Sequence, residues 1–420
     1  MLLKLGRHGL LFALAKSAVL VAPILAASLL GVAEYGAVEW WIAMSLIVGP
    51  LIGFGAHGVV AYGSVGSQDR RHIRTAVVVV IAASAALDLA SVAVLIAGVG
   101  GSSLFAPVAL QSAVVVLQLT VSARLKGLGR GAWASVAESS LYLSLLAAVG
   151  LAWMGSNFVE AYLIVLLVAS VGLISVLLSS VGMRPSLSWL ERDFRGFVRR
   201  GVGYLVGGVL LGLFMSMPRA VLGFAGSVEA VAQFAIAFRW LSIAIVAHQF
   251  INTLFFRRLF ADSTPGSRDG PLATTVLLVA FAALAVIGLL ASGLPSRFGV
   301  AIPRPGTLVW LLAAAIVLWS ATACMEGALF RVGAIGDQSR AVCAGLLAQI
   351  AANLALMKVI DDRILLVTVA WLIGLATMIA GQHRKLRQAG TPLPMVVGVA
   401  LGGAVVAVSI ACLASSGTNP

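Results

Sequence analysis

Thirteen apolar stretches, each long enough to cross a lipid bilayer, constrain this chain more than any other feature. A transmembrane helix needs about 20 mostly apolar residues, and only helices or closed barrels satisfy the backbone hydrogen bonds within hydrocarbon. The chain is 10% charged, whereas soluble domains are about 25% charged. We therefore expect an all-α polytopic membrane protein with spans near 9–30, 37–64, 75–97, 104–124, 132–154, 158–181, 201–222, 229–256, 271–292, 307–330, 341–359, 363–381 and 393–414.

The basic residues are distributed unequally over the loops between these stretches. Of the 28 Lys and Arg residues, 21 fall on one side of the membrane and 4 on the other, and Lys16, Arg219 and Arg239 lie within spans. Cytoplasmic loops of membrane proteins are enriched in Lys and Arg. We therefore expect a cytoplasmic N-terminus, and we interpret the net charge of +13 as an orientation signal and not as a sign of nucleic-acid binding.

The loop after the sixth stretch divides the chain into two comparable parts. The segment MRPSLSWLERDFRGFVRR, residues 183–200, is amphipathic and is expected to lie on the inner leaflet with Trp189, Leu190, Phe194 and Phe197 facing lipid. We predict an N-terminal lobe of six helices at 1–182, this linker, a C-terminal lobe of six helices at 201–390, and an extra helix at 391–420. Twelve core helices in two parallel repeats are expected, because residues 29–47 and 221–243 share a Leu-Gly, acid and aromatic pattern.

Motifs for catalysis and for metal binding are absent from the sequence. It contains no GxxxxGK[ST], HExxH or GxSxG pattern. Cys324, Cys343 and Cys412 have no metal-ligand spacing, and we interpret them as small apolar side chains. The minority-side loops are short, whereas a polymerase working on that face would need a larger one. We expect a protein that is not an enzyme and that has no cofactor and no metal.

Three segments resemble a known family of transporters. SLLGVAEYGAVEWW at 28–41, PLIGFGAHGVVAYGS at 50–64 and PRAVLGFAGSVEAVAQFAIAFR at 218–239 are similar to bacterial polysaccharide flippases. These belong to the multidrug/oligosaccharidyl-lipid/polysaccharide exporter superfamily, which includes multidrug extruders and lipid II flippases. The chain departs from the pattern at Pro218, where many relatives have Asp, and at Phe234 or Phe238, where they have Tyr.

The resemblance implies transport by alternating access in a bacterial cytoplasmic membrane. Helices 1, 2, 7 and 8 would line a central cationic cavity that binds the diphosphate and sugars of an undecaprenyl-diphosphate-linked oligosaccharide, as in the export of O-antigen or exopolysaccharide. The implied partners are this polyprenyl-diphosphate-linked glycan, the lipid bilayer and a polysaccharide polymerase or assembly machinery. Two alternatives remain: an ion-coupled extruder of organic cations from the same superfamily, and a membrane glycan polymerase.

Arg239 lies near the middle of the apolar stretch FAIAFRWLSIAIVAHQF, residues 234–250. A charge at the centre of a membrane helix costs about 2.5–3.5 kcal/mol on insertion scales, so a compensating group is expected. We interpret Arg239 as a phosphate-binding cation, since a guanidinium donates two parallel hydrogen bonds to phosphate oxygens. The alternative is a structural salt bridge to an acid such as Asp88. Ser242 and Gln249 continue the same helical face and are predicted to contact substrate.

Two further cations lie within the predicted spans. Lys16 on the first span either lines the central cavity or extends to the inner headgroups. Arg219, near the outer end of the seventh span, either contacts outer-leaflet headgroups or binds a substrate phosphate at the exit side. We predict that both contribute to substrate binding.

Three titratable residues are candidates for coupling transport to an ion. Asp88 is the deepest acid, and it is either an ion-coupling site or the counter-charge of Arg239 or Lys16. Glu39 and His57 lie 18 residues apart and would share one face of a straight second helix.

Two prolines lie within the first and second predicted spans. Pro23 and Pro50 each remove a backbone hydrogen bond and are expected to kink their helices. A hinge that moves during transport and a static kink both fit this pattern. Pro50 also lies between Glu39 and His57 and would disturb their common face.

Overall fold

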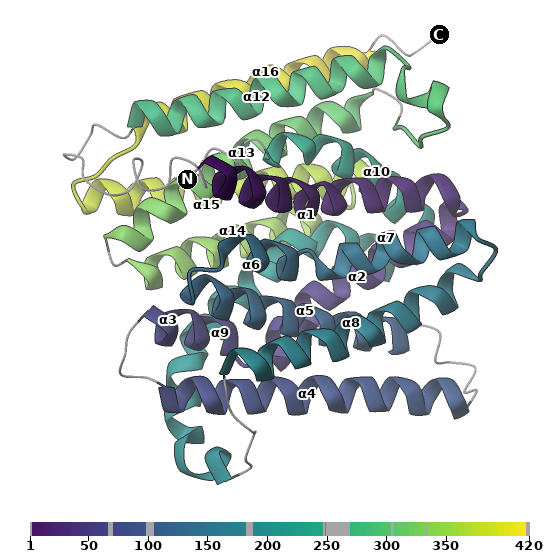
Figure 1. Ribbon diagram of the computed structural model, residues 1–420. Coiled ribbons are helices and arrows are strands. Elements are labelled where there is room, and N and C mark those ends of the chain that lie inside the picture. Colours follow the sequence, from purple (N-terminus) through teal and green to yellow (C-terminus); the bar gives the residue numbers. More distant parts are fainter. Residues whose placement is uncertain are drawn as a thin grey trace. The chain divides into compact units, whose positions relative to one another are not determined.

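The computed structural model describes residues 2–65, 70–97, 105–181, 188–246, 248, 269–303, 306–332 and 334–416. Every regular element in these ranges is helical (Figure 1), which confirms the predicted all-α class. The elements are α1 (Leu2–Leu29), α2 (Val32–Ile52), α3 (Ala56–Val65), α4 (Arg70–Ala97), α5 (Phe105–Gly127), α6 (Gly131–Glu138), α7 (Ser140–Trp153), α8 (Phe158–Val181), α9 (Ser188–Phe224), α10 (Val228–Leu241), α12 (Asp269–Ala291), the 3₁₀ helix η1 (Pro295–Phe298), α13 (Thr307–Arg331), α14 (Ile335–Leu356), α15 (Arg363–Gln388) and α16 (Pro394–Ser416).

The helices are long and apolar enough to make this a multi-pass membrane protein. Twelve helices in the described ranges have the length and the hydropathy to span a bilayer. The bent pair α6 and α7 forms a thirteenth span if it is taken as one element. These spans coincide with the thirteen stretches predicted from the sequence, including α16, the predicted extra helix at the C-terminal end. The described part of the predicted eighth span ends at Val246.

Contacts between residues divide the chain into two compact units. One, here called the N-terminal unit, contains residues 1–30 and 38–216, and the other, the C-terminal unit, contains residues 31–37 and 217–420. The boundary between them lies within α9. The predicted grouping into two repeated lobes of six helices stays a prediction.

Helix α5 forms the core of the N-terminal unit. Most of its side chains are buried, and it packs against α3, α4, α6 and α8. Two glutamines on α5 hydrogen-bond to neighbouring helices within this apolar interior. Gln111 Nε2 donates to the hydroxyl of Tyr162 on α8 at 3.2 Å, and Gln118 Oε1 accepts from the backbone amide of Leu141 on α7 at 3.2 Å. Because these groups are removed from lipid and water, their bonds fix the register of three helices.

The fifth predicted span is broken at Ser139. Helices α6 and α7 meet there at 57°. The hydroxyl of Ser139 donates to the carbonyl of Ser135 at 3.0 Å, an arrangement that commonly bends helices. A break inside a membrane frees backbone amides, which must be satisfied by other groups. Gln118 satisfies the amide of Leu141 and so makes this break possible.

The second predicted span is also broken, three residues after Pro50. Helix α2 ends at Ile52, and α3 begins at Ala56. Phe54 and Gly55 have φ angles of 48° and 72°, which belong to the left-handed region. A Cβ on Gly55 would lie 2.1 Å from the carbonyl oxygen of Gly201 on α9, so only glycine fits this close approach. The expected common face of Glu39 and His57 is therefore wrong, because the helix does not continue between them.

The described part of the segment expected at 183–200 is helical and continuous with the seventh predicted span, and residues 183–187 lie outside the described part. From Ser188, helix α9 runs without interruption to Phe224, a length of 37 residues. The prediction that Phe197 faces lipid is wrong: this side chain is fully buried, with its ring centroid 6.2 Å from that of Phe194. The physical reason is close packing, since a Cβ on Gly196 would lie 2.8 Å from Nε2 of His72 on α4. Phe194 is exposed, and the side chains of Trp189 and Leu190 lie outside the described part.

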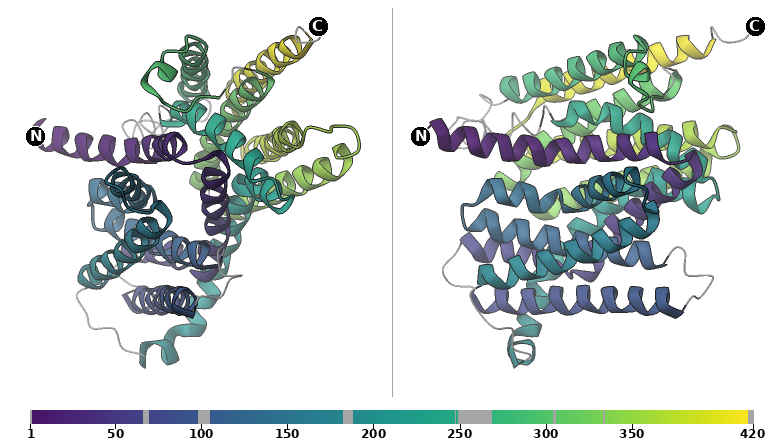
Figure 2. Two further views of the ribbon diagram at one scale, coloured as in Figure 1. Left: turned by 90° about the vertical axis from the view of Figure 1, so that its right-hand side faces the viewer. Right: turned by 45° about the vertical axis from the view of Figure 1, so that its right-hand side comes forward.

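Helix α13 forms the core of the C-terminal unit. It packs against α10, α12, α14, α15 and α16, and most of its length is buried. Gln382 on α15 connects the helices around it: its Nε2 donates to the carbonyl of Thr322 on α13 at 3.2 Å and to Oε1 of Gln338 on α14 at 2.8 Å. The views in Figure 2 show α12 and α16 side by side, and both contact α13.

The first residue of α12 caps the N-terminus of α16. The carboxylate of Asp269 accepts hydrogen bonds from the backbone amides of Met395 at 2.7 Å and Val396 at 3.0 Å. The first amides of a helix have no partner within the helix, and a carboxylate satisfies them well. Asp269 is buried, with 5% of its surface exposed, so its charge is compensated by these amides.

Candidate functional site: buried charged residues of the membrane helices

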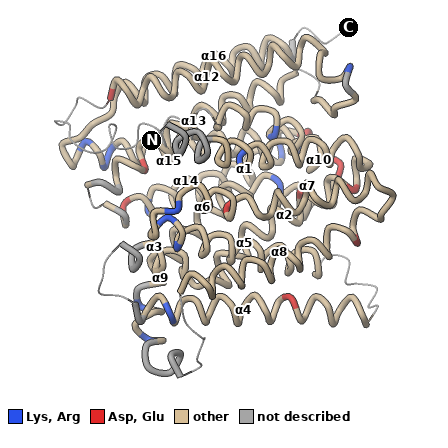
Figure 3. Tube along the Cα trace, viewed as in Figure 1, with Lys and Arg blue, Asp and Glu red and all other residues tan. Residues whose placement is uncertain are grey.

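Few charged residues interrupt the apolar spans, and each of them needs a partner or a function. The tube in Figure 3 is mostly free of charged residues along the helices. Charged residues within the described membrane helices include Lys16, Glu39, Asp88, Glu138, Arg219 and Arg239. Charges inside membrane segments are costly and commonly mark transport pathways. They form the candidate site, and the two units are described in turn.

Lys16 in the N-terminal unit forms an ion pair with Glu138. Its Nζ lies 3.4 Å from Oε2 of this residue, at the end of α6. The other carboxylate oxygen of Glu138 accepts a hydrogen bond from the Ser122 hydroxyl at 2.9 Å and one from Lys126, both on α5. The cluster therefore holds two ammonium groups and one carboxylate. Lys16 is bound within the helix bundle instead of extending to headgroups, and its predicted contact with substrate stays a prediction.

Asp88 has a neutral partner. On α4, its Oδ2 accepts a hydrogen bond of 2.6 Å from the hydroxyl of Ser170 on α8. Its Oδ1 is buried and has no hydrogen-bond partner in the part of the chain that the structure describes. The expectation that Asp88 neutralises Lys16 is wrong, since Lys16 pairs with Glu138. Its role in ion coupling stays a prediction.

Glu39 and His57 lie on different helices of the broken second span. Glu39 on α2 is fully buried. His57 on α3 is half-buried, and its ring lies against Gly208 on α9. Their predicted joint role in ion coupling has no support from a shared helical face.

Helix α1 continues past Pro23 without a break, but the second predicted span is interrupted shortly after Pro50. Pro23 is buried within α1, which runs through it without a break. Pro50 precedes the break at residues 53–55 and is itself still helical. A kink was expected at Pro50, and the structure instead has a break a few residues later, whose turn is built by Phe54 and Gly55. Whether either position moves stays a prediction.

Arg239 in the C-terminal unit is buried near the end of α10. Only 5% of its surface is exposed. Helix α10 ends at Leu241, and the hydroxyl of Ser242 donates to the carbonyl of Arg239 at 2.7 Å. Ser242 keeps helical backbone angles and its amide donates to the carbonyl of Phe238 at 2.8 Å, and the predicted polar face from Arg239 through Ser242 stays a prediction. Gln249, the third member of that face, lies outside the described residues.

Arg219 lies over an aromatic cluster. This α9 residue is buried, and its Cζ lies 5.9 Å from the ring centroid of Phe238 on α10. Phe238 also contacts Phe234 and the buried Trp371 on α15, with centroid distances of 6.2 and 5.9 Å. A guanidinium above an aromatic ring is attracted electrostatically to the negative face of the ring. The alternative of a headgroup contact at the surface is wrong, because the side chain is only 5% exposed.

Sequence reasoning missed several partners of these residues. Ser122 and Lys126 lie four residues apart on α5, and this helical spacing places both on one face toward Glu138. Trp371 gave no signal, because a tryptophan in an apolar helix is common in any membrane protein. In the described part of the chain, no group of three His, Cys, Asp or Glu residues is placed to bind a metal.

Twelve spans in the described ranges, or thirteen with the bent pair α6 and α7, define the class as a multi-pass membrane protein with charged residues inside its helices. No family model matches the sequence, and no curated protein matches it. Solved structures resemble the fold over nearly the whole chain. The lipid II flippase MurJ in an inward closed conformation has a TM-score of 0.66 and 14% identity, covering 96% of this chain and 92% of its own.

Two multidrug transporters share the fold as well. An inward-facing multidrug resistance MATE family transporter of the MOP superfamily has a TM-score of 0.50 and 13% identity, covering 95% of this chain and 94% of its own. The MATE multidrug transporter DinF-BH in complex with R6G has a TM-score of 0.59 and 15% identity, covering 91% and 93%. The chain therefore has the fold of these membrane transporters.

Proposed function

We propose that the protein is a flippase of the multidrug/oligosaccharidyl-lipid/polysaccharide exporter superfamily. Its substrate is an undecaprenyl-diphosphate-linked oligosaccharide, which it moves from the inner to the outer leaflet of a bacterial cytoplasmic membrane by alternating access. The N-terminus is cytoplasmic, as the distribution of Lys and Arg favours. The fold shared with a lipid II flippase supports the class.

The observation that carries the proposal is the pair of buried arginines on α9 and α10. Arg219 and Arg239 are each 5% exposed, and Arg219 lies over Phe238, the residue that precedes Arg239. Both arginines are thus buried within one unit, on the consecutive helices α9 and α10. Guanidinium groups bind phosphate oxygens through paired hydrogen bonds, which suits them to a diphosphate. Lys16 and Lys126, which outnumber Glu138, add positive charge on the N-terminal unit.

The energetics favour the proposed direction of transport. A diphosphate buried alone in hydrocarbon would carry a prohibitive desolvation cost, and buried cations offset it. Moving one negative charge out of a cell with a negative interior gains about 2.3 kcal/mol per 100 mV. A substrate with two such charges therefore moves downhill without a dedicated coupling ion.

Arg239→Gln tests the proposal in proteoliposomes that contain a fluorescent polyprenyl-diphosphate glycan. A quencher outside the vesicles measures how fast the labelled lipid appears in the outer leaflet. We expect Arg239→Gln to lower this rate about 10–100-fold, with Arg239→Lys retaining part of it. Arg297→Gln removes an exposed charge from η1 and is the matched control. Unchanged transport by folded Arg239→Gln protein would refute a central role for this residue.

The multidrug extruders of the same fold give a second candidate function. Asp88 favours it, since a buried carboxylate with one oxygen free of hydrogen bonds in the described part of the chain suits an organic cation or a coupling ion. Asp88→Asn in a pump-deficient host separates the two functions. An extruder would raise resistance to organic cations, and this resistance would be lost in Asp88→Asn. A flippase would leave the susceptibility profile of the host unchanged.

A polysaccharide polymerase or assembly complex is the proposed partner of the flippase. A glycan on the outer leaflet must be consumed by an enzyme that acts on that face, since its own return would be uphill. Chain-length analysis of the surface glycan tests whether the protein itself polymerises. In a strain that lacks it, a flippase predicts loss of the glycan at every length, whereas a polymerase predicts single repeat units at the surface.

A further inference from the structure

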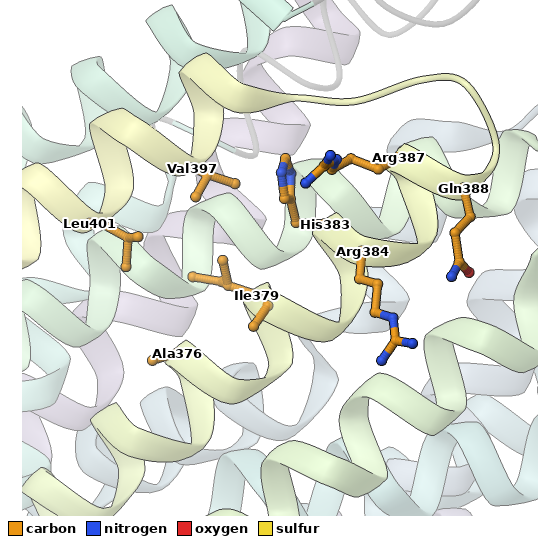
Figure 4. A pocket seen from close by; sticks show the side chains of 9 residues that line it. Ala376, Ile379, His383, Arg384, Arg387, Gln388, Val397 and Leu401 are labelled. Atoms are coloured by element: carbon orange, nitrogen blue, oxygen red, sulfur yellow. The ribbon is translucent and has the colours of Figure 1, made fainter.

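A pocket of about 590 Å³ opens between α15 and α16 of the C-terminal unit. Its lining includes Ile379, His383, Arg384 and Arg387 from α15, and Val397 and Leu401 from α16 (Figure 4). None of the predicted substrate-binding residues lines it. The volume lies within the range of about 300–1,000 Å³ that is typical of small-molecule sites. The pocket is therefore large enough for a headgroup-sized ligand.

One side of the pocket is cationic. Arg384 and Arg387 are exposed, and no ion pair or hydrogen bond of either side chain is found among the described residues. In Figure 4 the guanidinium of Arg387 points toward the ring of His383. Nδ1 of His383 is buried and has no hydrogen-bond partner in the described ranges. Three basic side chains thus line one pocket, and one of them, His383, has a ring nitrogen left to bond a ligand.

Neighbouring charges are already engaged and do not compete for an anion. Lys385, between the two arginines, lies 3.4 Å from the carboxylate of Asp337, which also pairs with Arg340 at 3.0 Å. The N-terminus of α16 is not an anion site, because the amides of Met395 and Val396 donate to Asp269. An anion in the pocket must therefore be bound by side chains of α15.

The other side of the pocket is apolar. Ile379, Val397 and Leu401 lie along the spans of α15 and α16, toward the interior of the membrane relative to the arginines. A ligand that fits both sides has an anionic head and an apolar tail. Basic pockets between transmembrane helices at the cytoplasmic surface bind anionic lipid headgroups, and the last turn of α15 belongs to the side with the excess of Lys and Arg.

We propose that this pocket binds an anionic glycerophospholipid of the bilayer. Its phosphodiester group lies between Arg384 and Arg387, His383 bonds the headgroup, and the first carbons of the acyl chains lie against Val397 and Leu401. This site is separate from the residues proposed to bind the transported glycan lipid. It holds the glycerophospholipid as a bound ligand between α15 and α16. The proposal does not depend on the identity of the transported substrate.

Native mass spectrometry of the full-length chain with added phosphatidylglycerol or phosphatidylcholine tests the proposal. We expect wild-type protein to retain phosphatidylglycerol preferentially. Arg384→Gln/Arg387→Gln should lower its binding about tenfold without changing that of phosphatidylcholine. Arg130→Gln/Arg199→Gln removes two exposed arginines outside the pocket and serves as the charge-matched control.

A second variant distinguishes a lipid from a free phosphate. Leu401→Trp fills the apolar side and leaves the arginines in place, so it should lower phosphatidylglycerol binding as well. Glycerol phosphate, which has the same head but no tail, should not displace the lipid at equal concentration. The proposal is wrong if the pocket variants and the control lower binding equally, if neither pocket variant lowers it, or if glycerol phosphate displaces the lipid fully.

Discussion

Lys16 on α1 lies 3.4 Å from the carboxylate of Glu138 on α6, and the same carboxylate bonds Lys126 and Ser122 on α5. Three helices of the N-terminal unit are thus joined at one acidic side chain. Glu138 is 26% exposed, while Lys16 is 17% exposed, so neither charge is fully hydrated. Removing the shared carboxylate leaves two ammonium groups without their counter-charge, whereas removing Lys16 leaves an intact pair.

Glu138→Gln should therefore destabilise the protein more than Lys16→Met. We expect Glu138→Gln to lower the free energy of unfolding by about 1–3 kcal/mol and Lys16→Met by about 1 kcal/mol or less. SDS unfolding titrations of both variants and of the double variant measure the coupling free energy between Lys16 and Glu138. If the two single changes add without coupling, the ion pair does not exist in the folded protein.

Gln118→Leu should destabilise the broken span. The change removes the acceptor of the Leu141 amide and leaves this amide unsatisfied within the membrane, at a cost of about 1–3 kcal/mol. Hydrogen exchange of the Leu141 amide should rise in the same variant. Thr377→Leu, a change of a polar residue on the exposed side of α15, is the control. Unaltered exchange at Leu141 would show that Gln118 does not hold this break.

Gly55→Ala should destabilise more than Gly129→Ala. Both glycines have nearly the same φ angle, 72° and 71°, so the conformational cost of about 1 kcal/mol is shared. A Cβ at Gly55 meets the carbonyl oxygen of Gly201, whereas one at Gly129 meets nothing within 4 Å. The difference in unfolding free energy between the two variants measures the contact of the α2–α3 turn with α9. Equal losses would contradict this close contact.

Asp269→Ala should loosen the N-terminus of α16. Loss of a helix-capping side chain costs about 0.5–2 kcal/mol, and Asp269→Asn should lose less, because its single oxygen still accepts one of the two bonds. Limited proteolysis between α15 and α16 should become faster. Asp361→Ala, an exposed acid beside the cap of α15, should leave both measurements unchanged. A proteolysis rate equal to that of the wild type in Asp269→Ala would exclude the cap.

Length and hydropathy predict the spans of this fold well, because every helix that crosses the bilayer needs about 20 mostly apolar residues. Thirteen apolar stretches match the described spans, including α16. The interruptions were harder to predict. Pro50 predicts a kink in the second span, and a break follows at residues 53–55. Ser139 gives no comparable signal, since the bend there depends on Gln118 and on a hydroxyl that bonds its own helix. Tertiary partners decide such positions.

The sequence indicates which residues are costly in a membrane, but not which partners compensate them. Lys16 and Asp88 were each predicted to be at depth, and both are part of polar contacts. Their partners, Glu138 and Ser170, lie 122 and 82 residues further along the chain. No local pattern connects residues at such separations, so the pairing could come only from the packing of α1 on α6 and of α4 on α8.

The cap between Asp269 and α16 has a consequence for biogenesis. The carboxylate is synthesised 126 residues before the amide of Met395 that it binds. While the intervening helices are inserted one after another, this acid stays at the membrane surface without its eventual partner. The later synthesis of α16 then supplies the amides that allow the acid to become buried, so this corner of the C-terminal unit closes only after α16 has been made.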